Sequence, residues 1–156
     1  MAESASLIKK IRKIVYKIVF KVMNEFNKKI ITEFRANNGK VGGMFAGMEL
    51  VLVTTKGAKS GKEVIFPVAY TKDGETYVIV ASKGGAPENP AWYYNLIANP
   101  EVTVEVGTEK FKAKAVEAKG EERERLFNQH AAQYPTFNDY KAKTTRVIPV
   151  FTLERI

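Results

Sequence analysis

The sequence predicts an α+β fold in which five or six short strands form a mostly antiparallel sheet that closes fully or partly into a small barrel. Three observations support this fold. Apolar and polar residues alternate over several stretches between positions 48 and 156, turn residues separate these stretches at hairpin spacing, and the 156 residues contain no linker-like segment. We therefore expect a barrel domain at residues 28–156, preceded by a helix at residues 1–27.

The N-terminal helix is predicted by apolar residues between Leu7 and Phe26 that recur at the i, i+3, i+4 and i+7 positions of one helix face. Six basic residues and one acidic residue, Glu3, give residues 1–23 a net charge of +5, out of +8 for the whole chain. Lysines interrupt the stretch too often for a transmembrane span. Three partners are consistent with the apolar stripe: the protein's own domain, a membrane surface, or another protein.

The first elements after this helix are a second helix and three strands. We expect the helix at residues 28–37, with Gly39 as its left-handed cap. Strands are expected at residues 48–55, 62–71 and 75–82. Asp73 and Gly74 suit a tight turn between the second and third strands, and Pro67 indicates an edge strand or a bulge.

The rest of the chain predicts further helices, a second hairpin and a final strand. We expect a helix at residues 90–98 with Asn89 as its N-cap, and a hairpin around Gly107. A helix at 120–135, a short helix or turn at 136–144, and a C-terminal strand complete the predicted elements.

The composition limits the chemistry of any active site. The chain has no cysteine, which excludes disulfides, a thiolate nucleophile and cysteine metal ligands. Its single histidine, His130, excludes a histidine-rich metal site, and we expect this residue at the surface or as a helix cap. No metal site is predicted, so the remaining options are simple binding or a bound organic cofactor. The pI near 9.6 favours anionic partners, but the basic residues are not interleaved with the aromatic residues that stack on nucleic acid.

Three segments carry candidate binding groups. Residues 59–62, Lys-Ser-Gly-Lys, follow a strand and predict either a hairpin loop with solvated lysines or a cradle for phosphate. Residues 82–85, Ser-Lys-Gly-Gly, combine donors with flexible backbone, and the alternative is a helix cap with Trp92 in the core. Tyr134, Phe137 and Tyr140 predict a core stripe, or hydroxyls that position or protonate a substrate.

The segments at residues 33–43, 54–61, 81–100, 134–140 and 145–150, in this order and spacing, resemble the deazaflavin-dependent nitroreductase family of split-barrel oxidoreductases. The resemblance implies a split β-barrel of the FMN-binding type. It also implies that coenzyme F420 is the cofactor, and that its reduced form delivers a hydride to quinones, nitro compounds or activated alkenes. FMN is the less favoured cofactor, and a deazaflavin-binding module without turnover is the non-enzymatic alternative.

The resemblance also implies roles for individual residues. The implied cofactor-binding residues are Lys59, Ser60, Gly61, Lys62, Pro67, Ser82, Lys83, Gly84, Gly85 and Trp92. The implied catalytic residues are Ser82, Tyr134 and Tyr140. Ala58 and Val64 stand where the family commonly has arginine, and Phe137 stands where nitro-reducing members have tyrosine. We expect a cytoplasmic enzyme, with residues 7–26 as a peripheral contact to the inner face of the cell membrane.

Overall fold

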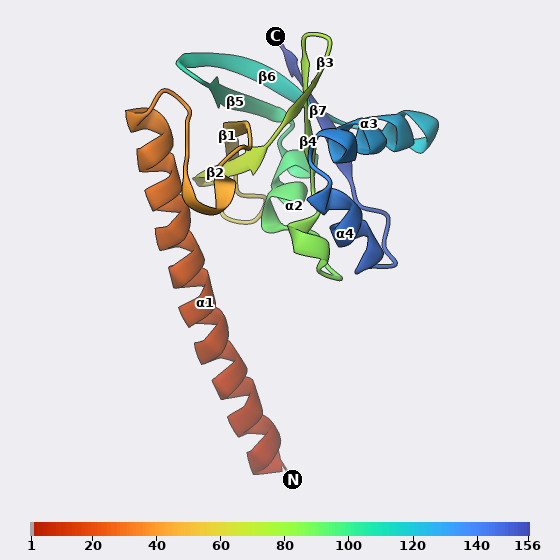
Figure 1. The fold of residues 1–156 in the computed structure, drawn as a ribbon. Coiled ribbons are helices and arrows are strands. Elements are labelled where there is room, and N and C mark those ends of the chain that lie inside the picture. The colour runs from red at the N-terminus through yellow and green to blue at the C-terminus, as the bar shows by residue number, and fades with distance from the viewer. Residues whose placement is uncertain (1) are drawn as a thin grey trace.

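The structure is a computed structural model that describes residues 2–156 (Figure 1). The helices are α1 (Ala2–Ala36), α2 (Ala91–Ala98), α3 (Gly120–Gln133) and α4 (Thr136–Ala142), with short 3-10 turns η1 (Gly43–Phe45) and η2 (Lys83–Gly85). The strands are β1 (Leu50–Lys56), β2 (Glu63–Ala69), β3 (Thr71–Asp73), β4 (Thr76–Val80), β5 (Glu101–Val106), β6 (Glu109–Glu117) and β7 (Val150–Arg155).

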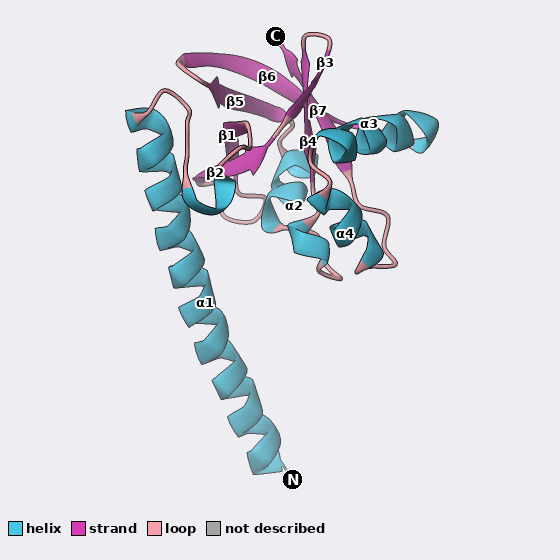
Figure 2. Cartoon of the chain, in the orientation of Figure 1, coloured by secondary structure: helices cyan, strands magenta, loops and turns pink. Residues whose placement is uncertain are grey.

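The seven strands form one sheet in the order β2-β1-β5-β6-β7-β4-β3, and every neighbouring pair is antiparallel. The two edge strands, β2 and β3, are separated along the chain by Tyr70 alone. The sheet must therefore curl until its edges approach each other, and Figure 2 shows the strands curled with the helices around them. The expected α+β barrel fold is confirmed, and Pro67 lies on an edge strand as expected.

The predicted hairpin between residues 62–71 and 75–82 is wrong in its pairing. The first segment divides at Tyr70, so β2 pairs with β1 whereas only the short β3 pairs with β4. The expected tight turn at Gly74 is confirmed, since Asp73 lies opposite Thr76 and Gly74 has a φ of 62°. The division makes β3 a separate, seventh strand. Alternation did not predict it, because three residues are too few to show an alternating pattern of apolar and polar residues.

The N-terminal region is one helix rather than the two that we expected. Residues 24–30 contain no glycine or proline, so nothing ends the helix between the two predicted segments. The expected cap is confirmed at Gly39, which has a φ of 91° and donates its amide hydrogen to the Phe34 carbonyl at 2.7 Å.

Only the last turns of α1 pack on the barrel. Ile30 and Phe34 are buried, and Arg35 donates two hydrogen bonds, of 2.9 and 3.1 Å, to the Glu105 carboxylate. The large hydrophobic residues from Leu7 to Phe26 are 41–70% exposed, and Figure 1 shows this part of α1 extending away from the other elements. Packing of the stripe on its own domain is therefore contradicted.

The core has two parts on opposite faces of the sheet. Along β1, Val51 and Val53 belong to a cluster that gathers side chains from six strands and α2 inside the barrel. Leu50 and Leu52 point the other way, into a cluster shared with α1, α3 and α4. The loop after β1 and the turn after β4 carry most of the candidate cofactor-binding residues.

Candidate functional site

The turn after β4 exposes a row of backbone amides. Ser82 is right-handed, with φ of −76° and ψ of −35°, and the next three residues, Lys83, Gly84 and Gly85, have φ of 47°, 64° and 84°. A right-handed residue followed by a left-handed one directs successive amides to the same side, and such a nest binds anions. Within residues 2–156, the Ser82, Lys83 and Gly84 amides have no acceptor, whereas the Gly85 amide donates to the Ser82 carbonyl at 3.0 Å.

The same turn lies directly on α4. A Cβ atom added to Gly85 would lie 2.7 Å from the Tyr140 carbonyl oxygen and 2.9 Å from the Lys143 Cβ, so only glycine allows this contact. A Cβ added to Gly84 would meet no atom within 4 Å. The structure thus brings residues 82–85 and Tyr140 together, with an open side at Gly84.

Two hydroxyl groups, that of Ser82 in this turn and that of Tyr140 on α4, have no protein partner within residues 2–156. Ser82 is 6% exposed, and neither its Oγ nor the Tyr140 Oη has a hydrogen bond within residues 2–156. The fully buried side-chain atoms that lack a partner in the described chain are Thr55 Oγ1 and His130 Nε2. The Ser82 and Tyr140 hydroxyls therefore reach accessible space, where a ligand can bond to them.

Tyr134 differs from Tyr140 because its hydroxyl is occupied. It accepts hydrogen bonds from the Glu49 amide (3.0 Å) and Gln133 Nε2 (3.1 Å), and it donates to the Tyr70 carbonyl (3.0 Å). Burial raises the pKa of Tyr134 above its usual value. This side chain thus holds the junction of β2 and β3.

His130 is buried, so the expectation of a surface or capping histidine is wrong. It belongs to the face of α3 that packs on the sheet, and its Nδ1 lies 2.9 Å from Thr71 Oγ1. Burial lowers the pKa of His130 to about 4. The spacing of the buried residues of α3, Arg123, Leu126, Phe127, His130 and Ala131, follows the i, i+3, i+4, i+7 rule and could have predicted this burial.

The lysine-bearing loop at residues 57–62 joins β1 to β2. The Gly57 amide donates to the Lys62 carbonyl at 2.8 Å, which closes the loop, and Lys59, Ser60, Gly61 and Lys62 are all exposed. The Ala58 amide donates to Asn95 Oδ1 at 2.9 Å, and Asn99 Nδ2 donates to the Lys56 carbonyl at 3.3 Å. These contacts fix the loop beside the C-terminal half of α2.

The two candidate loops lie toward opposite ends of α2. Arg146 contacts both the Ser82 carbonyl and Asn89 Oδ1, which places the Ser82 turn at the N-terminal end of α2. An eight-residue helix is about 12 Å long. A compact anion cannot contact both loops, so a ligand that uses both must be elongated.

Trp92 and the predicted tyrosines lie in different parts of the core. The Trp92 ring stacks on Phe66, with centroids 4.9 Å apart and planes 7° from parallel, inside the barrel. Tyr134 and Phe137 belong to the outer cluster, with Tyr140 packed against it. Pro67 follows Phe66 in β2, so its side chain points to the opposite face of the strand from Phe66.

Sequence reasoning misassigned Asn89 and did not single out Arg146. The N-cap of α2 is Pro90, without a side-chain bond, so the expected Asn89 cap is wrong. Asn89 Oδ1 instead accepts a 2.7 Å hydrogen bond from Arg146 Nη1. The partners of Arg146 are 57–65 residues away along the chain, and no local pattern signals them.

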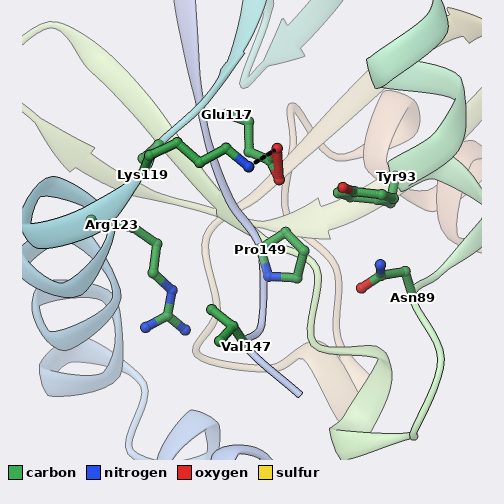
Figure 3. Close-up of a pocket in the computed structure, with 9 residues that line it drawn as sticks. Asn89, Tyr93, Glu117, Lys119, Arg123, Val147 and Pro149 are labelled. Carbon is green, nitrogen blue, oxygen red and sulfur yellow. Dashed lines mark hydrogen bonds and ion pairs between the residues drawn. The ribbon is translucent and has the colours of Figure 1, made fainter.

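A cavity of about 240 Å³ lies beside Asn89 (Figure 3). Figure 3 shows Tyr93 and the Lys119–Glu117 ion pair around it, with 2.6 Å between the charged atoms. The lining residues are Asn89, Tyr93, Glu117, Ala118, Lys119, Gly120, Arg123, Val147 and Pro149. None is a predicted site residue, and the volume is below the usual range for pockets that enclose an organic ligand.

Comparison with known proteins identifies the family. The family model described as "F420H(2)-dependent quinone reductase" matches residues 27–155. The chain belongs to this family. An F420H(2)-dependent quinone reductase of Mycobacterium tuberculosis is 38% identical over 128 residues, which cover 78% of this chain and 85% of that protein. The expectation of an F420-dependent oxidoreductase, and of the quinone reductase branch, is confirmed.

Two solved structures extend the comparison to the fold. The F420-H2 dependent reductase FDR-A is 44% identical with a TM-score of 0.64, over 68% of this chain and 94% of that chain. A protein described as a domain-swapped dimer is 37% identical with a TM-score of 0.65, over 86% of this chain and 98% of its own. These similarities confirm the split-barrel fold.

The residues at the two loops are suited to F420, which carries a flat ring and an anionic tail. The free amides of Ser82, Lys83 and Gly84 can donate hydrogen bonds to an anionic or carbonyl oxygen, and the open space at Gly84 admits a flat group against the backbone. Lys59 and Lys62 carry positive charge at the far end of α2. An elongated anionic cofactor fits this arrangement of donors.

Proposed function

We propose that this protein binds reduced F420 along α2, between the two loops, and reduces a quinone beside Ser82 and Tyr140. The observation that carries the proposal is the turn at residues 82–85, where three unpaired amides, the unpaired Ser82 hydroxyl and an open glycine come together beside the Tyr140 backbone. The family description supports the same cofactor and substrate class.

The lysines and the backbone have the binding role in this proposal. Lys59 and Lys62 attract the phosphate and the acidic tail, while the amides of Ser82, Lys83 and Gly84 hold the ring and its linker. Lys83 Nζ is engaged by Glu88 at 2.8 Å, so its side chain contributes less than its amide. Ala58 and Val64 offer no cationic fork, and the exposed lysines supply a weaker, salt-sensitive attraction.

The hydroxyls have the catalytic role. When bound, reduced F420 supplies the hydride. Ser82 Oγ and Tyr140 Oη donate hydrogen bonds to the quinone oxygen, which orients the acceptor and stabilises the negative charge that develops there. Tyr140 Oη can also hold the proton that this oxygen takes up. Tyr134 has a supporting role in this proposal, because its own hydroxyl is bonded within the protein and its ring packs on Phe137, which packs on Tyr140.

Nitro compounds and activated alkenes are secondary acceptors in this proposal. Phe137 is buried against the His130 and Tyr140 rings, at centroid distances of 4.5 and 5.2 Å, and has no hydroxyl to offer. Tyr140 is therefore the single phenol of α4, whereas a nitro group presents two adjacent oxygens. We expect turnover with menadione to exceed turnover with a nitroimidazole.

The experiment that tests this function is the oxidation of reduced F420 by the purified full-length protein, followed by its absorbance, with menadione as acceptor. Turnover that depends on protein and on menadione is the expected result. FMN replaces F420 in a parallel reaction as the cofactor control. If F420 is not bound at micromolar concentration, the proposed function is wrong.

We further propose that α1 attaches the enzyme to the inner face of the cell membrane, where lipid quinones reside. No helix within residues 2–156 is long and apolar enough to cross a bilayer. Residues 2–26 are exposed along their whole length, with an apolar stripe on one side and six basic residues on the other. A basic amphipathic helix of this kind lies in the interface of anionic membranes.

Vesicle sedimentation tests this attachment. We compare residues 1–156 with residues 27–156, which retain Ile30 and Phe34, the two buried residues of α1. Full-length protein should bind phosphatidylglycerol-containing vesicles, and the shortened chain should remain in solution with unchanged menadione turnover. Sedimentation of both chains, or of neither, contradicts the attachment by α1.

A further inference from the structure

Arg146, in the segment between α4 and β7, bonds to four groups of the turn that contains Ser82. Its Nε donates to the Ala86 carbonyl at 2.9 Å, and its Nη1 donates to Asn89 Oδ1 at 2.7 Å. Its Nη2 donates to the carbonyls of Ser82 at 2.8 Å and of Ala81 at 3.3 Å. One guanidinium thus spans residues 81–89 from one side.

The contacts determine where the backbone amides of the turn point. A trans peptide unit is planar, and its carbonyl and its N–H point in opposite directions. The Ala81 carbonyl shares a peptide plane with the Ser82 amide, and the Ser82 carbonyl shares one with the Lys83 amide. Because both carbonyls are held on Arg146, the Ser82 and Lys83 amides are directed away from it, and neither has a partner within residues 2–156.

The turn needs such support because its backbone conformation is unfavourable. Lys83 has a φ of 47°, one of two positive values among non-glycine residues of the described chain, and two further left-handed residues follow it. Conformations of this kind persist only where the surroundings impose them. Only a planar guanidinium, with its donors fixed in one plane, can bond the three carbonyls and Asn89 together; a lysine ammonium cannot.

We propose that Arg146 is a positioning residue for cofactor binding: it holds the peptide planes at residues 81–83 so that the Ser82 and Lys83 amides face F420. It does not contact the cofactor, and it acts through the backbone of the turn. This inference rests on the proposed function, which assigns these amides to F420.

The test compares Arg146→Lys with Arg125→Lys in full-length protein. Arg125 also makes several bonds through its guanidinium, to Asp73 and Glu122, but none of its partners lies in residues 81–89. We expect Arg146→Lys to weaken F420 binding by about tenfold, measured as Kd in an absorbance titration, and Arg125→Lys to leave it within about twofold. In the cofactor-free Arg146→Lys protein, the Ser82 and Lys83 amide NMR resonances should shift while those of β5 stay unchanged.

The possible outcomes separate the inference from the proposed function. An Arg146→Lys protein that is folded and binds F420 as tightly as the wild type overturns the inference. If that variant does not fold, Asn89→Ala decides, because it removes one of the four partners: we expect about threefold weaker binding, and unchanged binding overturns the inference. If the wild type does not bind F420, the proposed function is wrong. In that case the NMR spectra still test the role of Arg146: unchanged Ser82 and Lys83 amide resonances in Arg146→Lys show that Arg146 does not position this backbone.

Discussion

The Tyr134 hydroxyl donates a 3.0 Å hydrogen bond to the carbonyl of Tyr70, the single residue that joins the two edge strands of the sheet. The same oxygen accepts a hydrogen bond from the Glu49 amide, next to β1. Tyr134 therefore fastens α3 to the junction where the barrel closes. This relationship separates the tyrosine that holds the fold from Tyr140, whose hydroxyl is free to meet a ligand.

Replacement of Tyr134 by phenylalanine should destabilise the protein without removing the cofactor site. The change leaves the Glu49 amide and the Tyr70 carbonyl without their partner, which costs about 1–3 kcal/mol in the free energy of unfolding. Urea denaturation measures this loss. Tyr140→Phe serves as the matched variant, since we expect it to lower menadione turnover with little loss of stability. If instead Tyr140→Phe loses stability and Tyr134→Phe loses only turnover, the assignment of roles to the two tyrosines is wrong.

Stability should fall as the pH decreases from 6.5 toward 4 because of His130. The unfolded chain binds a proton at this residue near pH 6.5, whereas burial keeps the folded residue neutral down to a pKa of about 4. Between these values the unfolded state binds more protons, so acid favours unfolding, by up to about 3 kcal/mol for this group.

The pH dependence is measured as the difference between wild type and His130→Gln, because exposed carboxylates titrate in the same range. Glutamine can keep a hydrogen bond to Thr71 and does not titrate. The variant should lose less stability than the wild type between neutral pH and pH 4. Parallel curves for the two proteins refute the assignment to His130.

Lys59 and Lys62 should contribute to F420 affinity through charge. Both side chains are exposed, so the loss of either should weaken binding by about 1 kcal/mol or less, roughly fivefold in Kd, and less at high salt. Lys59→Ala and Lys62→Ala are titrated with F420 at two salt concentrations. Lys114→Ala, an exposed lysine on β6, is the control. Equal affinity for all three variants excludes this loop from the phosphate site.

The residue pattern predicted the parts of the fold that depend on local spacing. Alternation located the strands, Gly74 and Gly39 located a hairpin turn and a helix end, and the ordered motifs indicated the family. The pairing of β2 with β1 was missed because it depends on closure at Tyr70, which only the complete strand order defines.

The site was less accessible from the sequence because its contacts join distant segments. Gly85 was singled out, but its residue type does not reveal that Tyr140 is the group it contacts, and no local spacing indicates the bonds of Arg146 to backbone carbonyls. His130 was misplaced because a histidine was judged by itself rather than by its position on the apolar face of α3.

The central claim is that F420 lies against the turn at Gly84, and two alanine substitutions test it most directly. Gly84 and Gly74 have φ of 64° and 62°, and a Cβ at either position meets no protein atom within 4 Å. Gly84→Ala and Gly74→Ala should therefore cause similar backbone strain, and only the first places a methyl group at the proposed site. An F420 titration should give at least about tenfold weaker binding for Gly84→Ala and wild-type affinity for Gly74→Ala. Equal, wild-type affinity for both variants contradicts the account.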